Sequence, residues 1–282
     1  FLTPSIKQGK DGLDLSIPYF FSLASNYDLT ISPRYIEERG SDLSTEGRFL
    51  TNNSKGMLAF SYFSDDRKFN AQTGYGKKRW ATKVNSHSNL GSNLYIKLDT
   101  EHVSDNLYFE DLNDDILGTQ QKDFLTRSLA IRFDKENFIL KGKLNQFQNL
   151  NPFSYDEYET RPHVNFDYHN KFNNLGLRLI TDYSKFSYEE NYNPLEKDKH
   201  LKRIYIEPSL SFEKNSHFSF LSFKTGKRNV AYDNDISSVD NSYKWAELTY
   251  KVFLNKREGS KFKSLSPITK LVWIDGENRF NK

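Results

Sequence analysis

Apolar and polar residues alternate along most of the chain, which is typical of β-strands whose two faces meet different surroundings. Leu94, Ile96 and Leu98 share one face by parity, and Lys97 lies on the other. Such runs lie at 12–24, 27–39, 41–51, 55–64, 77–87, 92–104, 122–134, 137–147, 161–169, 175–187, 201–213, 217–228, 242–255 and 262–275. They are about 9–14 residues long. This is longer than the usual strand of a soluble protein and matches the length of a tilted membrane strand. The pattern predicts an all-β antiparallel protein.

The connections between these runs alternate in length from residue 55 onward. Long ones lie near 65–76, 105–121, 148–160, 188–200 and 229–241, and short ones near 88–91, 135–136, 170–174, 214–216 and 256–261. Outer-membrane barrels have long loops outside and short turns in the periplasm, whereas a soluble sandwich has no reason to alternate so regularly. The sequence therefore favours a segment of an antiparallel transmembrane β-barrel over a soluble β-sandwich.

Composition agrees with this choice. Mean hydropathy is −0.76, and no apolar run is long enough for a spanning helix. Aromatic residues make up 15% of the 282, which argues against disorder. The chain has 40 Lys and Arg and 37 Asp and Glu, and the basic residues form no block along it. We therefore expect no nucleic-acid partner. The chain has no Cys, which excludes disulfides and thiol chemistry within it.

Candidate catalytic chemistry is sparse. The six histidines, His87, His102, His163, His169, His200 and His217, form no metal-type spacing, and no nucleophile or nucleotide motif occurs. We therefore expect no catalytic residues, no metal and no cofactor. Acidic groups at Asp111/Asp114/Asp115, Asp156/Glu157/Glu159 and Asp233/Asp235/Asp240 fall in the long connections. Solvated loops explain them most simply, although paired carboxylates can also hydrolyse glycosides.

Several motifs resemble those of the LptD family, the lipopolysaccharide-assembly proteins of the Gram-negative outer membrane. The resemblance is most specific over residues 1–50 and extends to about residue 275. The motifs are Phe1-Leu2-Thr3-Pro4-Ser5, the segment 15–35, Glu38-Arg39-Gly40, Glu46-Gly47-Arg48-Phe49-Leu50, Lys78-Arg79-Trp80, Val103-Ser104-Asp105, Tyr108-Phe109, Arg203 to Pro208, and Leu265-Ser266-Pro267. One departure is that Phe21 or Ser22 stands where the family has Trp.

The resemblance implies a single partial barrel domain over 1–282 without an internal boundary. The family barrel has about 26 strands, so the runs here, with Phe1–Gln8 as a further strand, would supply about 14–15 of them. We expect the family's periplasmic β-jellyroll, the closing strands and the cysteines to lie outside this segment.

The resemblance also implies a function. The family moves lipopolysaccharide into the outer leaflet of the cell outer membrane through a barrel with a lateral gate, without enzymatic chemistry or a cofactor. Its partners are lipopolysaccharide, an LptE-like plug lipoprotein inside the barrel, outer-membrane lipid, and an LptA-like periplasmic bridge reached through the missing N-terminal domain. A further hypothesis is that divalent ions bridge the acidic loops to lipopolysaccharide phosphates.

Pro18 and Pro33 are the candidate gate residues. They stand fifteen residues apart, and we expect them in adjacent antiparallel strands at the first edge of the barrel. A proline cannot donate to a neighbouring strand, so pairing there is weakened. Ordinary strand curvature is the alternative explanation, and the family's matching prolines at its lateral opening favour the gate. Prolines inside other runs are Pro162, Pro208 and Pro267.

Two other functions share part of this pattern. A passive outer-membrane porin shares every physical feature except the motifs, and a soluble carbohydrate-binding or hydrolytic β-protein shares the alternation.

Which side of the membrane each loop faces depends on which strand is the first. With Phe1–Gln8 first and a tight turn at Gly9–Gly12, the long loops lie outside, and tags at Gly74 and Asp114 are expected to be reachable on intact cells.

Overall fold

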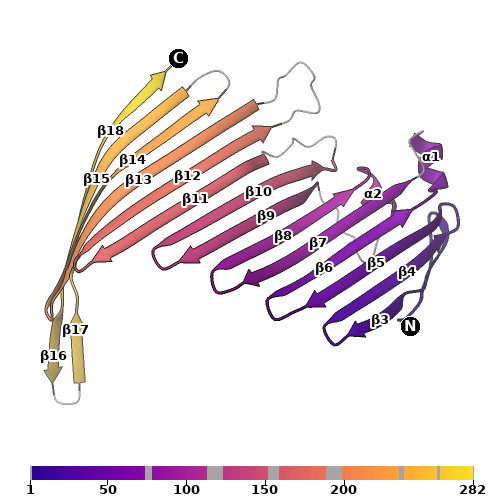
Figure 1. Ribbon diagram of the computed structural model, residues 1–282, viewed down its shortest axis with the longest axis horizontal. Coiled ribbons are helices and arrows are strands. Elements are labelled where there is room, and N and C mark those ends of the chain that lie inside the picture. Colours follow the sequence, from indigo (N-terminus) through magenta and orange to yellow (C-terminus); the bar gives the residue numbers. More distant parts are fainter. Residues whose placement is uncertain are drawn as a thin grey trace. The chain divides into compact units, whose positions relative to one another are not determined.

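The computed structural model describes residues 2–73, 78–112, 123–151, 159–188, 199–234, 238–258 and 261–281 (Figure 1). Gly74 and Asp114 lie outside these ranges. The strands are β1 (Ser5–Gly9), β2 (Gly12–Ser16), β3 (Tyr19–Ala24), β4 (Tyr27–Ile36), β5 (Gly40–Leu50), β6 (Ser54–Phe63), β7 (Arg79–Leu90), β8 (Leu94–Val103), β9 (Phe124–Lys135), β10 (Phe138–Asn149), β11 (Glu159–Phe172), β12 (Leu175–Tyr188), β13 (Lys199–Asn215), β14 (Ser219–Asn234), β15 (Ser238–Val252), β16 (Leu254–Glu258), β17 (Lys261–Leu265) and β18 (Ile268–Asn281). Two short helices, α1 (Arg67–Thr73) and α2 (Tyr108–Asp111), interrupt them.

The strands form antiparallel sheet in two compact units, so the predicted all-β antiparallel fold class is confirmed. The first unit is built mainly from Phe1–Arg132 and has the strand order β1-β2-β4-β5-β6-β7-β8-β9, with β3 also paired to β4. The second is built mainly from Thr160–Ser187 and Asp198–Lys282, with the order β11-β12-β13-β14-β15-β18. From β4 to β15, each strand within a unit lies beside the next along the chain, as in a meander.

Most predicted strand bounds agree with the structure to within a few residues, and the first hairpin is also confirmed. Gly9 pairs with Gly12 across the β1–β2 turn, where Gly12 has φ +82°. A side chain at Gly12 would collide with Glu37, because its Cβ would lie 2.4 Å from the Oε2 atom. Glycine is therefore required there for both its backbone conformation and its size.

Two predicted strands are wrong in their extent. The run 12–24 is two strands, β2 and β3, interrupted at Ile17 and Pro18. The run 262–275 is also two strands, β17 and β18, separated at Ser266 and Pro267. Proline removes a ladder donor, which explains both interruptions.

The connection predicted near 256–261 is longer than a turn. The structure places a separate two-stranded sheet there, in which β16 pairs with β17 from Leu254–Leu265 to Glu258–Lys261. Five paired residues on each side gave an apolar-polar alternation that merged with the flanking strands in the sequence. The two helices were also missed, because each is too short to establish a helical period.

The distribution of buried and exposed residues is inverted relative to a soluble protein. On β5, Asp42 and Ser44 are buried, whereas Leu43 between them is 47% exposed. On β13, Glu207 is buried, whereas Leu210 is 57% exposed. Soluble sheets bury their apolar face, and outer-membrane strands turn that face toward lipid. No helix in the described ranges is both long and apolar enough to span a bilayer.

The buried apolar residues gather at one end of the first unit. The cluster comprises Ile36, Ala59, Phe63, Ala81, Val103, Tyr108, Leu112, Leu125 and Leu150. Most of these residues begin or end a strand, or lie in α2 and the segments beside it. This end of the strands, where the Gly9–Gly12 turn, the 37–39 turn, α1 and α2 lie, is called the turn end below.

Candidate functional site

Pro18 and Pro33 lie on adjacent segments beside the first edge of the sheet. Strands β2 and β3 pair with different halves of β4, with Ser16 opposite Arg34 and Tyr19 opposite Ile31. Between these halves lies the break at Ile17 and Pro18, which faces Pro33. The prediction that the two prolines lie on adjacent antiparallel segments is confirmed for their position. Pro33 lies within β4, and Pro18 lies in the break rather than in a strand.

The missing donors of the two prolines point in opposite directions. The N–H of Ile17 donates to the carbonyl oxygen of Pro33 at 3.1 Å, and an antiparallel pair of this kind would normally return a bond from residue 33. Proline has no N–H, so that bond is lost. The carbonyl oxygen of Pro18 accepts from the N–H of Leu2 at 3.1 Å, so its own missing donor faces the N-terminal segment. Pairing is thus weakened on both sides of the break.

The break divides the first edge into two unequal halves. Toward the turn end, β1 covers β2 with paired residues from Ser5–Ser16 to Gly9–Gly12. Beyond the break, β3 pairs with β4 and with no other strand in the described part of the chain. The edge is therefore closed by a hairpin on one side of Pro18, and carries no second strand on the other.

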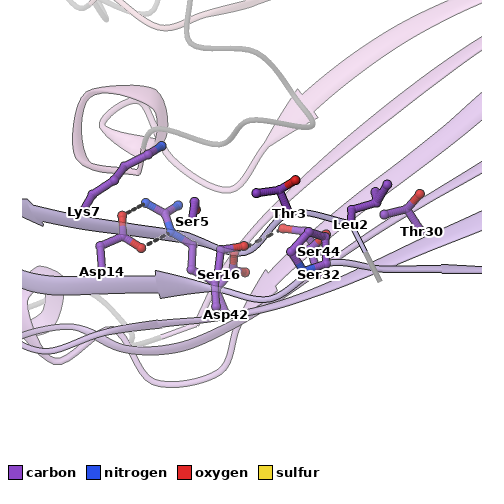
Figure 2. Close-up of a pocket in the computed structure, with 12 residues that line it drawn as sticks. Leu2, Thr3, Ser5, Lys7, Asp14, Ser16, Thr30, Ser32, Asp42 and Ser44 are labelled. Carbon is purple, nitrogen blue, oxygen red and sulfur yellow. Dashed lines mark hydrogen bonds and ion pairs between the residues drawn. The ribbon is translucent and has the colours of Figure 1, made fainter.

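A polar hollow of about 220 Å³ lies beside the break (Figure 2). Most of the described residues that line it are polar types, among them Ser16, Ser32 and Ser44, and the hydrophobic ones are Leu2 and Pro18. The lining comes from β1, β2, β4 and β5 together with the N-terminal residues. The hollow therefore presents hydroxyl and charged groups directly at the interrupted edge.

Two hydrogen-bonded groups fix the walls of this hollow. The guanidinium of Arg34 donates to both carboxylate oxygens of Asp14, with Nε–Oδ1 at 2.8 Å and Nη2–Oδ2 at 2.6 Å. This bidentate geometry is the strongest form of the pair. On the neighbouring strand β5, Asp42 pairs with Arg34 in the ladder and accepts from Ser61 at 2.9 Å, and Ser44 donates to Ser61 at 3.0 Å. The walls are therefore ordered even though the edge beside them is interrupted.

Charged and polar side chains also share one face of the strands of the second unit. Asp182 accepts from Arg203 at 2.7 Å and lies 2.6 Å from the Nε2 atom of His163. Asp167 accepts two bonds from Arg178, at 2.9 and 2.6 Å. Further along, Glu207 accepts from both Tyr205 and Arg228, and Arg228 also contacts Tyr243. These pairs form a polar track across β11 to β15, as the alternation of the sequence predicted for one face of each strand.

Sequence reasoning missed the most buried charges. Arg39, Asp66 and Arg79 are each at most 1% exposed, and they lie together at the turn end of the first unit. In the sequence, Arg39 and Arg79 stand out only as parts of motifs, and no pattern marks Asp66. The only sequence signal was the position of the two arginines, with Arg39 beside a turn and Arg79 at the start of a strand. Their shared partner, Asp66, is separated from both in the sequence.

In each unit, antiparallel strands carry exposed apolar residues on one face and polar residues on the other, which is the pattern of an outer-membrane β-barrel segment. The family model described as "LptD: LPS transport system D" matches residues 77–258. The chain therefore belongs to the LptD family.

Individual relatives support the assignment. The LPS-assembly protein LptD of Pseudomonas entomophila is 33% identical over 202 residues, covering 70% of this chain and 20% of the relative. That of Pseudomonas syringae pv. syringae is 31% identical over 268 residues, covering 84% of this chain and 28% of the relative. The chain thus spans under a third of the length of these curated relatives.

One solved structure, that of Acinetobacter baumannii OccAB4, aligns over 95% of this chain and 88% of its own. The TM-score of 0.31 and identity of 11% are too low to support any argument about this chain.

Proposed function

We propose that this chain is part of an outer-membrane barrel that delivers lipopolysaccharide to the outer leaflet of the Gram-negative outer membrane. Its relatives are named LPS-assembly proteins, and the exposed apolar strand faces suit a lipid environment. The proposal includes the single partial barrel domain over 1–282, the plug lipoprotein, and the periplasmic bridge reached through a domain outside this segment. No covalent step is required.

We further propose that lipopolysaccharide leaves sideways at the first edge, with Pro18 and Pro33 as gate residues. The observation that carries this proposal is the break between β2 and β3 opposite Pro33, which leaves β3 attached to β4 alone in the described part of the chain. Two lost donors and a polar hollow beside them suit an amphipathic cargo. The phosphorylated sugar head would follow the polar face, and the acyl chains would pass directly into hydrocarbon.

The test replaces both prolines with good strand formers, as P18V/P33V. Each recovered N–H offers a hydrogen bond worth about 0.5–1.5 kcal/mol, so the double variant should disfavour opening by about five- to a hundredfold. We expect full-length barrel abundance to be unchanged and surface lipopolysaccharide to fall. Cells should then become sensitive to large hydrophobic antibiotics.

The matched control is P208V, because Pro208 also interrupts a strand pairing but lies in β13. The ladder between β13 and β14 is interrupted at this proline, between the pairs Ile206–Asn229 and Ser209–Gly226. Normal transport by P18V/P33V at normal abundance would contradict the gate. It would mean that the two prolines only curve the strands. Ion conductance by the barrel without any lipopolysaccharide delivery would favour a passive porin.

A further inference from the structure

The tip of the first hairpin is fastened by charged groups. Asp11 lies in the turn between β1 and β2, and its carboxylate accepts from Nε of Arg39 at 2.6 Å and from Nζ of Lys68 at 2.5 Å. Lys68 also donates to Glu38 at 3.0 Å. Arg39 and Glu38 belong to the turn between β4 and β5, and Lys68 lies in α1. One turn residue is therefore bound to two other segments of the turn end.

The arginine that holds Asp11 is itself locked in place. Arg39 is 1% exposed, and its other guanidinium nitrogens lie 2.9 Å from Asp66 and 3.0 Å from Asp111. Both carboxylates are shared with Arg79, at 3.0 and 2.9 Å. Buried charges of this kind are stable only as a complete set, because removal of one partner leaves another charge uncompensated. The group Asp11, Arg39, Asp66, Lys68, Arg79, Asp105 and Asp111 is called the turn-end cluster below.

Backbone hydrogen bonds reinforce the same joint. The N–H of Glu38 donates to the carbonyl oxygen of Asp11 at 3.1 Å, and the N–H of Glu37 donates to that of Leu13 at 2.9 Å. The N–H of Leu13 in turn donates to Oε2 of Glu37 at 2.8 Å. At the other end of the hairpin, Leu2 contributes one backbone bond, to Pro18. The hairpin is therefore held strongly at its tip and weakly at the break.

The charge states of the turn-end cluster agree with this geometry. Burial alone would raise the pKa of the Asp11 carboxyl, but the hydrogen bonds from Lys68 and Arg39 outweigh it and lower that pKa below its ordinary value. The hydrogen bonds to Asp11 and Glu38 raise the pKa of Lys68. Both groups therefore stay ionised at neutral pH.

We infer that Asp11 and Arg39 are positioning residues that keep the turn end of the first edge closed, so that opening occurs only on the β3 side of the break. This inference rests on the proposed lateral gate. It specifies where the gate opens. The turn end of the edge stays fixed, and the edge opens from the proline break onward.

Two engineered disulfides in the full-length protein test the direction. Leu15 pairs with Tyr35 on the turn-end side of the break, and Tyr19 pairs with Ile31 on the other side. Both pairs lie two residues from the Ile17–Pro33 pair, so they have the same ladder geometry, and facing residues of a ladder lie within disulfide reach. This chain contributes no cysteine of its own to interfere.

We expect oxidised L15C/Y35C to deliver lipopolysaccharide as the parent does, and oxidised Y19C/I31C to reduce surface lipopolysaccharide at least fivefold, with recovery on reduction. Loss of delivery by L15C/Y35C would overturn the fixed turn end. Normal delivery by Y19C/I31C would show that β3 does not part from β4 and would also overturn the inference, whereas normal delivery by P18V/P33V would contradict the gate itself, so the two failures are distinguishable. If both staples block delivery, the edge opens along its whole length and the inference is wrong.

A charge-removing variant gives the second readout. D11N removes the carboxylate that holds the hairpin tip, and we expect surface lipopolysaccharide to fall several-fold relative to the amount of folded barrel. Oxidised L15C/Y35C in the same chain should restore it, because the disulfide replaces the lost fastening of β2 to β4, and Y19C/I31C, which fastens β3 to β4, should not restore it. The matched control is D28N, because Asp28 forms a similar pair with Arg48, whose side chain is 53% exposed. Failure of the L15C/Y35C staple to rescue D11N would overturn the positioning role. If D11N lowers barrel abundance, the result for L15C/Y35C without D11N decides.

Discussion

Ile17 donates its N–H to the carbonyl oxygen of Pro33 at 3.1 Å, and Pro33 has no N–H to return. This one-sided pair lies at the point where β2 ends and β3 has not begun. Two residues away on either side, the ladder with β4 is regular. The interruption is therefore local, and the strands beside it retain their register.

Replacement of Arg34 should weaken the first edge. R34Q removes both hydrogen bonds to Asp14, whose carboxylate is 17% exposed and would be left without this charged partner. Hydrogen bonds to charged groups contribute about 1.5–3 kcal/mol, so we expect a loss of about that size in the free energy of unfolding. Urea unfolding of the full-length barrel in lipid vesicles measures it.

R48Q is the comparison, because Arg48 makes the same bidentate contact with Asp28 but is 53% exposed. Exposed pairs contribute about 0.2–1 kcal/mol. Equal losses for the two variants would show that the wall of the hollow has no special importance.

Arg79 should tolerate no substitution. Its side chain is fully buried, contacts Asp66, Asp105 and Asp111, and lies 4.1 Å from the ring centre of Phe69. R79A leaves three carboxylates without this partner, and breaking a buried ion pair costs about 3–5 kcal/mol. We expect barrel abundance to collapse on immunoblots. R79K should fail as well, because an ammonium cannot reproduce the guanidinium fork; recovery by R79K would mean that charge alone suffices.

The turn-end cluster should weaken in acid. The folded pKa of Asp11 lies below its ordinary value of 3.8, so its contribution is complete above that value and is lost as the pH falls through the folded pKa. Unfolding of the full-length barrel measured from pH 7 down to pH 3 should show a smaller pH dependence for D11N than for the parent. Parallel curves would show that Asp11 does not couple the turn to protonation.

Opposite ends of the strands should label on opposite sides of the membrane. Lys10 lies in the β1–β2 turn at the turn end, and Ser92 lies in the tight turn between β7 and β8 at the other end. A cysteine at Lys10 should react with an impermeant maleimide on intact cells, and one at Ser92 only after permeabilisation. The reverse pattern would invert the expected sidedness, including that of Gly74 and Asp114.

Much of the fold was determined by the sequence, because strand alternation is a local property. Parity alone separated Leu43 from Asp42 and Ser44, and the structure places them on opposite faces. The Gly9–Gly12 turn was readable for the same reason, since a tight turn needs particular residues at adjacent positions. The nearness of Pro18 and Pro33 followed from hairpin geometry once those strands were in place.

The construction of the first edge depends on contacts between segments that are distant in the sequence. The split of the run 12–24 depends on Pro33, which interrupts the pairing from the neighbouring strand. The turn-end cluster depends on Arg39 meeting Asp66 and Asp111, which lie 27 and about 70 residues further along the chain. Sequence periodicity reports which face a residue occupies, whereas contacts between distant turns arise only when the strands between them are laid side by side. The hairpin tip is therefore fixed by residues that no local pattern brings together.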